Sequence, residues 1–480
     1  MEYTHKVVVI GAGISGLACA FHLRQLGMRP LVLEVSDRAG GVISTIRRNG
    51  FLFEAGPQCP RFPTALWELA RELNLESEFV PGDPAAKRYI LRRGHLHPAP
   101  FSPGGLLGTR LVGLGSKLRI LSEAFRSSHP PAHEESLAEF IERKFGTEVL
   151  DYLVDPFIST IFLGDARRMG MESTFPALVE WERRQGSVAR GAIRARRSKQ
   201  NDGAPRGTAK SVSSHRDREG MRVTEALPSL GSFKAGMGTL PEKLAENLKD
   251  SIRYGAKIES IAPSRNEGSA TRAGWQMRLA TGEEIASDCL VLAVPAHAAA
   301  RLMERASPQL ASLLVAIEHA PMCVVSSAYN RSQVSHPLDG FGFMAPRRAG
   351  LHTICTFWNS SMFRGRAPDG TALMASFAGG TRDENLAALP EEECAQVIEA
   401  ENAKVLGIVG PPVDRMVWRY AQALPQYNVG HAARVAEIQT VMRTLPNLRL
   451  AGNYLTGRSI GDCVGVAFRA ADDLHGQSQT

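Results

Sequence analysis

The chain has 480 residues, of which 44% are hydrophobic, and carries a net charge of +7 at pH 7. This length exceeds what one hydrophobic core usually organises, so we expect two or three domains. No run of eighteen apolar residues and no signal-peptide pattern occurs, which predicts a cytoplasmic protein. The seven scattered cysteines favour reduced thiols over a disulfide framework, and the thirteen histidines lack metal-ligand spacing, so no metal site is expected.

Most of the net positive charge lies in one polar stretch, residues 190–219. This stretch contains nine Lys or Arg and three Asp or Glu, which accounts for six of the seven net charges. Because it is poor in aromatic residues and interrupted by Gly and Ser, it is typical of a mobile surface loop. Contact with anionic lipid or a protein partner is the alternative, and no nucleic-acid partner is expected.

Residues 7–16, VVVIGAGISG, have the pattern of a strand, a tight turn and a helix. Gly11, Gly13 and Gly16 have the spacing G-x-G-x-x-G. The first glycine permits the turn, the second lets the backbone approach a diphosphate, and the third lets the helix pack on the strand. The pattern predicts a dinucleotide held at the helix N-terminus, rather than a glycine turn that only packs.

A second set of residues indicates which dinucleotide binds. Glu34 ends the next predicted strand, where an acidic side chain can accept hydrogen bonds from ribose hydroxyls. Arg38, Gly40 and Gly41 then match the R-x-G-G extension of flavoproteins, and Gly56 belongs to a G-F-x-F-E-x-G-P element. A guanidinium beside two residues without side chains can follow an extended FAD along its diphosphate and ribityl chain. FAD is therefore favoured over a nicotinamide cofactor, and an ordinary basic turn is the alternative.

A second glycine turn lies at the other end of the chain, in residues 448–464, LRLAGNYLTGRSIGDCV. It too has a strand, glycines at 457 and 461, and the start of a helix. Because FAD is long, its isoalloxazine must be held some distance from its adenine. We expect the two turns to hold opposite ends of one FAD. The predicted contacts here are Gly461, Asp462 and Val464.

The positions of these turns predict an α/β fold with a discontinuous Rossmann-type FAD-binding domain. The middle of the chain supplies further strands of the same sheet at 253–261 and 289–297, and Ile258 is a predicted cofactor contact. A mixed α+β substrate domain and a helical, membrane-contacting subdomain complete the expected architecture. The predicted boundaries are 1–85, 225–300 and 425–480 for FAD binding, 86–95, 205–224 and 301–424 for substrate binding, and 96–204 for the helical subdomain.

Several further motifs extend a family resemblance over nearly the whole chain. They are AAKRYILRRG (85–94), ESLAEFIERKFG (135–146), LVDPFISTIFLGD (153–165), STFPALVEWER (173–183), KAGMGTLPEKL (234–244) and LPQYNVGH (424–431). With them the chain resembles the protoporphyrinogen oxidases, flavoenzymes of late haem synthesis that share a fold with monoamine oxidases. The basic stretch 190–219 departs from the shared pattern, and Gln58 occupies a site that varies within the family.

The resemblance implies hydride transfer from a porphyrinogen methylene bridge to the flavin, with no catalytic side chain assigned. It implies a flat apolar slot, in which Met344, Phe357 and Phe377 clamp the macrocycle. Arg88 would pair with a propionate, and Gly164 would direct a carbonyl toward the pyrrole N–H groups. The alternatives are a surface arginine, a glycine that only turns the chain, and ordinary core residues.

The apolar stretch 100–125 mixes Leu, Ile and Phe with Arg110, Lys117 and Arg119. This pattern is typical of a helix on a bilayer surface, and equally of a helix packed inside the substrate domain. Peripheral membrane contact of a cytoplasmic protein is the expectation.

The leading functional hypothesis is oxidation of protoporphyrinogen IX to protoporphyrin IX with O₂ as acceptor. Oxidation of coproporphyrinogen III to coproporphyrin III is the alternative, and Arg88 favours the first because the second branch commonly lacks this arginine. An amine oxidase is disfavoured because no cysteine between Cys394 and Cys463 offers covalent flavin attachment. A non-catalytic flavin- or porphyrin-binding protein is the remaining class. The implied partners are the porphyrinogen, O₂, and ferrochelatase or another haem-pathway protein.

Overall fold

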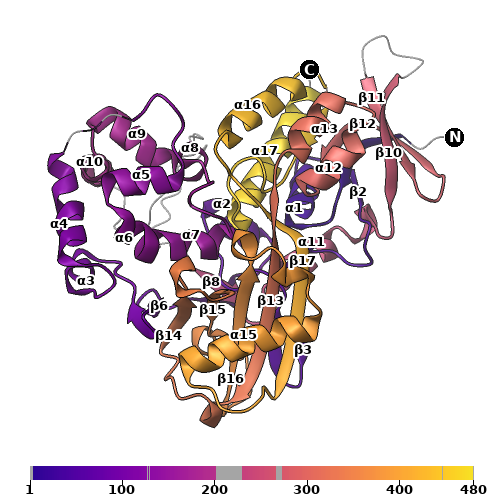
Figure 1. Ribbon diagram of the computed structural model, residues 1–480. Coiled ribbons are helices and arrows are strands. Elements are labelled where there is room, and N and C mark those ends of the chain that lie inside the picture. Colours follow the sequence, from indigo (N-terminus) through magenta and orange to yellow (C-terminus); the bar gives the residue numbers. More distant parts are fainter. Residues whose placement is uncertain are drawn as a thin grey trace.

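The computed structural model describes residues 4–126, 128, 130–201, 230–265, 273–445 and 447–478. Within these residues, two seven-stranded sheets form the framework, and a group of helices lies to one side of them (Figure 1). Two short two-stranded sheets complete the strands of the described chain. They are β3 (Thr45–Arg48) with β4 (Phe51–Glu54), and β5 (Phe79–Pro81) with β8 (Gly231–Phe233).

The first sheet is assembled from three distant parts of the chain. β1 pairs in parallel with β2 and β12, and β12 pairs in parallel with β18. The strand order is β10-β11-β12-β1-β2-β9, with β18 beside β12. The bounds are β1 Thr4–Ile10, β2 Pro30–Leu33, β9 Ile252–Arg253, β10 Ile258–Arg265, β11 Ala273–Leu279, β12 Glu284–Leu292 and β18 Leu448–Leu450.

Helices cover both faces of this sheet because alternate residues of β1 are buried on opposite sides. Val7 and Val9 pack with one group of helices, and Val8 and Ile10 pack with another. The first group is α1 (Ile14–Gln25), α2 (Thr64–Glu72), α11 (Thr239–Asn247) and α17 (Ile460–Ser478). The second is α12 (Ala296–Met303), α13 (Pro308–Val315) and α16 (His431–Met442). This doubly covered parallel arrangement is the Rossmann-type unit that the sequence predicts.

The second sheet is covered by a helix on one face, and its other face packs against β4. Its order is β17-β13-β16-β15-β14-β6-β7. The bounds are β6 Lys87–Arg92, β7 His95–Pro98, β13 His319–Asn330, β14 Gly340–Met344, β15 Thr353–Phe357, β16 Thr371–Gly379 and β17 Asp414–Pro425. Cys323 and Val325 of β13 face α15 (Glu391–Leu406), whereas Val324 packs on the opposite face. The short helix α14 (Asn359–Met362) packs beside β16.

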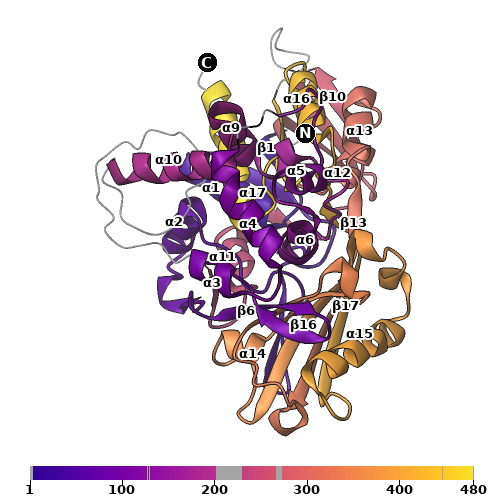
Figure 2. The ribbon, with the colours of Figure 1, turned by 60° about the vertical axis from the view of Figure 1, so that its left-hand side comes forward.

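The helical subdomain lies to one side of the two sheets in Figure 1 and in front of them in Figure 2. Its α-helices are α3 Pro103–Gly108, α4 Leu114–Ser122, α5 Leu137–Lys144, α6 Thr147–Val149, α7 Asp155–Phe162, α8 Met171–Thr174, α9 Pro176–Gln185 and α10 Val188–Asn201. Their apolar faces meet in a separate core that includes Phe140, Ile158 and Phe162. No helix among the described residues combines the length and the hydropathy needed to span a bilayer.

The start of the basic stretch differs from the expected mobile loop. Residues 190–201 belong to helix α10, because Arg, Ala and Lys are good helix formers and the helix packs closely on α9. A Cβ on Gly191 would lie 2.3 Å from the Cβ of Trp181, so the backbones approach closely there. Residues 202–219 lie outside the described residues.

One expected domain boundary also differs from the structure. Helix α13, within the segment 301–424 that the sequence assigns to the substrate domain, packs on the first sheet through Leu310 and Leu314. The sulfur atoms of Cys323 and Cys394 lie close together, but the Cα atoms of these residues are 7.6 Å apart, which is longer than in an ordinary disulfide, so the pair does not contradict the expected reduced thiols. These cysteines are distant in sequence, and only the packing of α15 on β13 brings them together. The other five cysteines form no disulfide in the described chain.

A buried ionic network holds the helical subdomain together. The guanidinium of Arg143 donates to both oxygens of Glu182, at 2.7 and 3.0 Å, and to those of Glu135. Lys144 lies 2.7 Å from the same Glu182 carboxylate, whose side chain is completely buried. Burial alone would raise the pKa of Glu182, but hydrogen bonds from Arg143, Lys144 and Ser128 lower it to about 2.

We predict that Glu182→Gln lowers the free energy of unfolding by about 3 kcal/mol, because Arg143 and the buried Lys144 lose the counter-ion that they share and keep only Glu135 and Glu123. The folded pKa lies below the unfolded value of about 4.3, so this stabilisation is present above about pH 5 and is lost as the pH falls toward 2. Urea unfolding of the holoprotein at several pH values measures the difference between wild type and variant, which should shrink in acid.

The matched control is Glu180→Gln on the same helix, because the side chain of Glu180 is 39% exposed and pairs with Arg183 and Arg184 at the surface. It should change the free energy of unfolding by less than about 0.5 kcal/mol. Equal effects of the two substitutions at pH 7 would contradict a stabilising role for the buried network.

Candidate active site

Glycine occurs at the three positions of the first turn for different structural reasons. Gly11 has a φ of 102°, and a Cβ there would lie 2.7 Å from the carbonyl oxygen of Ala293. A Cβ on Gly16 would lie 1.8 Å from the carbonyl oxygen of Gly11, so helix and turn require glycine there for packing. Gly13 has no atom within 4 Å of its ideal Cβ position. The described protein therefore gives no packing reason for this glycine, which fits the close approach of a ligand.

Glu34 organises the backbone beside this turn. One carboxylate oxygen accepts the Ala12 N–H at 2.6 Å, and the other accepts the N–H and hydroxyl of Ser36 at 2.9 and 2.7 Å. The side chain is buried at the end of β2. Glu34 thus fixes the shape of the turn, and a ribose contact would use the remaining lone pairs of the same oxygens.

The R-x-G-G extension lies directly against the first turn. Gly40 donates its N–H to the Ala12 carbonyl at 2.8 Å, and the ideal Cβ position of Gly41 lies 3.5 Å from the Gly13 Cα. Arg38 donates to the Ala39 and Gly41 carbonyls, at 3.2 and 2.7 Å, and remains exposed. The extension therefore continues the glycine surface that begins at Gly13.

The two glycine turns at opposite ends of the chain meet in space. Helices α1 and α17 pack side by side (Figure 2). The Ser15 side chain hydrogen-bonds Cys463 near the starts of the two helices. Further along, His22 contacts Asp472 at 2.8 Å. The helices thus run in the same direction, and both N-termini, with their unpaired amides, lie at one end.

Asp462 shapes the second turn. Its carboxylate accepts the N–H and hydroxyl of Ser459 at 3.0 and 2.6 Å, while the Asp462 N–H donates to the Ser459 hydroxyl. A Cβ on Gly457 would lie 2.5 Å from the Asp462 Cγ, and one on Gly461 would lie 2.3 Å from the Pro63 Cγ. These glycines allow close packing around the start of α17.

The other predicted cofactor contacts lie in packed surroundings. Val464 is completely buried in the first core, so only its backbone can reach a ligand. Gly56 is required for packing, since its Cβ would lie 2.5 Å from the Val42 carbonyl oxygen. Ile258 begins β10 and packs partly buried against the second core. A cofactor role for these three residues stays a prediction.

Strand register brings the three predicted macrocycle contacts to one face of the second sheet. Met344 is opposite Cys355, and Cys355 is opposite Phe377, so their side chains lie on the same face. Phe357 lies two residues along β15, and its ring is 5.6 Å from that of Phe377 in an edge-on arrangement. All three predicted side chains are only partly buried. Their arrangement provides an apolar surface on the face away from α15.

Arg88 is on β6, at the end of the same sheet. It pairs in register with Gly342, which is itself opposite Phe357. Its guanidinium lies 4.5 Å from the ring centre of Phe341 and 5.2 Å from that of Phe101. Burial lowers the pKa of Arg88, and no carboxylate pairs with it among the described residues. A partly desolvated cation between two rings is suited to bind an anion.

Gly164 follows helix α7, after Leu163 with a φ of 53°. A Cβ on Gly164 would lie 2.6 Å from the Met169 sulfur and 2.7 Å from the Gln426 side-chain oxygen. Close packing is therefore sufficient to explain this glycine. The role of its carbonyl toward pyrrole N–H groups stays a prediction.

Sequence reasoning missed the residues that join the second sheet to the segment after β4. The Tyr420 hydroxyl donates to the Ala55 carbonyl at 3.1 Å, and Asn359 donates its side-chain amide to Gln58. Trp418 is opposite Val324 on β13, and therefore shares the face of Phe377. The sequence signal for Trp418 and Tyr420 is the motif MVWRYA (416–421), in which large side chains alternate with a period of two, as in a strand with one buried face.

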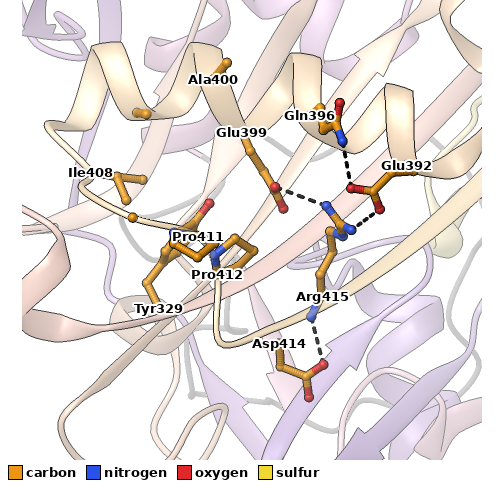
Figure 3. Close-up of a pocket in the computed structure, with 12 residues that line it drawn as sticks. Tyr329, Glu392, Gln396, Glu399, Ala400, Ile408, Pro411, Pro412, Asp414 and Arg415 are labelled. Carbon is orange, nitrogen blue, oxygen red and sulfur yellow. Dashed lines mark hydrogen bonds and ion pairs between the residues drawn. The ribbon is translucent and has the colours of Figure 1, made fainter.

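One cavity of the described protein lies elsewhere. It has a volume of about 530 Å³ and is formed between α15 and the ends of β13 and β17 (Figure 3). Arg415 in this cavity is already paired with Glu392 and Glu399. The Ser327 hydroxyl, also on the α15 face, donates to Glu399. The cavity is therefore on the opposite face of the sheet from Phe377 and is not continuous with the glycine turns.

Comparison with known proteins agrees with this geometry. Residues 14–475 match the family described as flavin-containing amine oxidoreductase. The chloroplastic protoporphyrinogen oxidase of Nicotiana tabacum is 30% identical over 486 residues, which cover 98% of this chain and 85% of that protein. The coproporphyrinogen III oxidase of Bacillus subtilis is 26% identical over 97% of each chain. A solved Exiguobacterium structure provisionally named protoporphyrinogen oxidase has a TM-score of 0.79 at 23% identity, covering 99% of this chain and 100% of that chain.

These relatives confirm the family resemblance, the predicted fold and FAD as the cofactor. The residues present fit FAD, because the open space at Gly13, the adjoining Gly41 and the N-terminus of α1 supply a backbone surface for its diphosphate, and the N-terminus of α17 lies at the same end. FAD brings the capacity to accept a hydride, and the chain supplies its binding and surroundings.

We predict that Gly13→Ala raises the Kd for FAD at least tenfold, because a methyl group would occupy the surface that a diphosphate approaches. The apoprotein should lose no more than about 1 kcal/mol of stability, since no protein atom obstructs the methyl group and the φ of Gly13 is −70°. FAD titration of the apoprotein, followed by flavin fluorescence, measures the effect.

Gly115→Ala is the matched control, because it also adds a methyl group with no neighbour within 4 Å but lies in helix α4. Its Kd for FAD should equal that of the wild type. Gly16→Ala should instead impair folding of the apoprotein itself. An unchanged Kd in Gly13→Ala would exclude diphosphate binding at this turn.

Proposed function

Because the chain belongs to the family of flavin-containing amine oxidoreductases, we propose that it uses FAD and O₂ to oxidise protoporphyrinogen IX to protoporphyrin IX. The similarity to a protoporphyrinogen oxidase over 98% of the chain supports this proposal. The single structural observation that carries it is Arg88, a cation without a described carboxylate partner beside an apolar sheet face.

The proposed roles of the residues follow from the chemistry of a porphyrinogen, which is a broad apolar ring system carrying carboxylates. Phe357 and Phe377 would contact the macrocycle and exclude water, as Met344 would at the neighbouring strand. Arg88 would bind a propionate and orient the ring, since a guanidinium can contact both carboxylate oxygens. Bound FAD would accept a hydride from the methylene bridge, so no protein nucleophile is required.

Coproporphyrinogen III is the second candidate substrate, and the similarity to the Bacillus subtilis enzyme favours it. An amine oxidase and a non-catalytic flavin- or porphyrin-binding protein are further alternatives. Aerobic formation of a fluorescent porphyrin from each porphyrinogen distinguishes the two oxidases from both of these. Association with ferrochelatase or another haem-pathway protein stays a prediction.

We predict that Arg88→Ala raises the KM for protoporphyrinogen IX about ten- to a hundredfold, because a hydrogen bond to a charged group contributes roughly 1.5–3 kcal/mol. The kcat should fall less if the contact is equally strong in the ground and transition states. Arg88→Lys should restore only part of the affinity, since lysine lacks the planar fork. Steady-state kinetics on both porphyrinogens test these expectations.

Lys87→Ala is the matched control, because Lys87 neighbours Arg88 on β6 but pairs with Asp339 at the surface. Its constants and FAD content should be unchanged. Unchanged constants in Arg88→Ala would exclude the propionate role and remove the preference for protoporphyrinogen. Failure of the wild type to oxidise either porphyrinogen would overturn the proposed function.

We also propose peripheral membrane contact through the helical subdomain. Its surface exposes Phe101, Leu107, Leu114, Leu118 and Phe125, with exposed fractions from 57% to 88%. Large apolar side chains grouped in this way are unusual on a water-facing surface. In the stretch 100–125, Lys117 and Arg119 differ from the sequence expectation, because both donate hydrogen bonds to backbone carbonyls. Apolar contact therefore supports the proposal more than charge does.

We predict that the double substitution Leu114→Glu and Leu118→Glu lowers binding to phosphatidylcholine–phosphatidylglycerol vesicles at least tenfold. Each apolar side chain that inserts contributes roughly 1.5–3 kcal/mol when fully buried, so even partial insertion of two exceeds 1.4 kcal/mol. Vesicle co-sedimentation measures the bound fraction. Val409→Glu is the control, because Val409 is 74% exposed but lies outside the helical subdomain. Equal binding of wild type and double variant would exclude this surface.

A further inference from the structure

Arg458 lies in the second glycine turn, between Gly457 and the start of α17. The turn is tightly defined, because Asp462 holds Ser459 by two hydrogen bonds and Gly457 leaves the space for that carboxylate. Both Asp462 contacts go to Ser459, and no ion pair joins Asp462 to Arg458 in the described chain. The cation at this position is therefore not neutralised by the carboxylate of its own turn.

The guanidinium of Arg458 stacks on an aromatic ring without gaining a hydrogen-bond acceptor. Its central carbon lies 3.2 Å from the ring centre of Phe162, the last residue of α7. Within the described residues Arg458 makes neither a hydrogen bond nor an ion pair. Burial lowers its pKa to about 10, although Tyr427 and Asp462 oppose this shift, so the group is still a cation at neutral pH.

The ring beneath Arg458 is held in place by its neighbours. Gln426 donates its side-chain amide to the Phe162 carbonyl at 2.9 Å, and the Tyr427 ring packs edge-on at 6.1 Å. The Tyr427 hydroxyl in turn donates to the Asn453 carbonyl, in the loop between β18 and α17. Phe162 is thus a fixed platform between the helical subdomain and the second turn.

A partly desolvated cation without an acceptor is unfavourable unless an anion from outside the chain completes its surroundings. A cation–π contact contributes only about 0.5–2 kcal/mol, which does not replace the lost hydration of a guanidinium. The second turn is where we expect the isoalloxazine end of FAD. Adding two electrons and one proton to FAD gives a reduced form with one additional negative charge, so a cation here would favour that form.

We propose that Arg458 faces the isoalloxazine end of FAD and stabilises its anionic reduced form, which raises the two-electron reduction potential of the bound flavin. Phe162 and the short turn fix the guanidinium in advance, so little reorganisation accompanies the change of charge. The inference rests on FAD binding at the second turn, and it does not depend on which substrate the protein oxidises.

The test is the midpoint potential of the bound FAD in wild type, Arg458→Met and Arg458→Lys. Xanthine with xanthine oxidase supplies the electrons, methyl viologen mediates, and a dye of known potential provides the reference. Arg458→Met should shift the equilibrium toward oxidised FAD at least tenfold, which is about 30 mV for two electrons. Arg458→Lys keeps the charge and should retain more than half of that difference.

Arg469→Met is the matched control, because Arg469 is an exposed arginine of helix α17, which follows the second turn. Its potential should equal that of the wild type. If Arg458→Met does not retain FAD, Arg458→Gln is compared with Arg458→Lys, and the same shift is expected.

Equal potentials in wild type and the uncharged variant would overturn the inference. So would an unchanged potential combined with a raised KM for porphyrinogen, which would assign the guanidinium to the substrate. The potential is measured without porphyrinogen. It therefore tests the role of Arg458 even if the protein does not oxidise either porphyrinogen.

Discussion

Parallel pairing of β12 with both β1 and β18 is the constraint on which the rest of the structure depends. It joins the beginning, the middle and the end of the chain in one sheet. The helices that follow β1 and β18 then pack side by side and begin at the same end, with Ser15 next to Cys463. One long cofactor can therefore meet two helix N-termini and two glycine turns, although more than four hundred residues separate those turns along the chain.

The second sheet is positioned against this unit by polar contacts and by packing. The β4 strand packs through Phe53 on the face of the second sheet that includes Trp418. Tyr420 and Asn359 add hydrogen bonds to the segment that follows β4. These contacts turn the face with Phe357 and Phe377 toward the FAD-binding half, while α15 covers the other face. The cavity beside Arg415 is on that other face, which is why its size does not make it the active site.

The charged residues divide into those whose counter-ions are within the chain and those that lack one. Arg143 and Lys144 share Glu182, and the buried Arg366 lies near Glu54, so these cations stabilise the protein itself. Arg88 and Arg458 are also partly desolvated, but the described chain provides them with aromatic rings and no carboxylate ion pair. Because desolvated cations need compensating charge, this contrast indicates two positions for external anions. One is suited to a substrate carboxylate, and the other to the reduced flavin.

The sequence by itself determined the Rossmann-type unit and FAD, because glycine spacing and β-branched runs reflect local backbone requirements, and further motifs carried the resemblance to the family. Gly11 and Gly16 show this directly, since a side chain at either would collide with backbone. Only the tertiary structure decided that α13 packs on the first sheet and that Arg458 stacks on Phe162, because these contacts join residues far apart in the chain. It also decided that residues 190–201 form a helix, since close packing of Gly191 on Trp181 adds to the helix-forming residues of this segment. Local patterns specify turns and strands, whereas which faces meet depends on the packing of the whole chain.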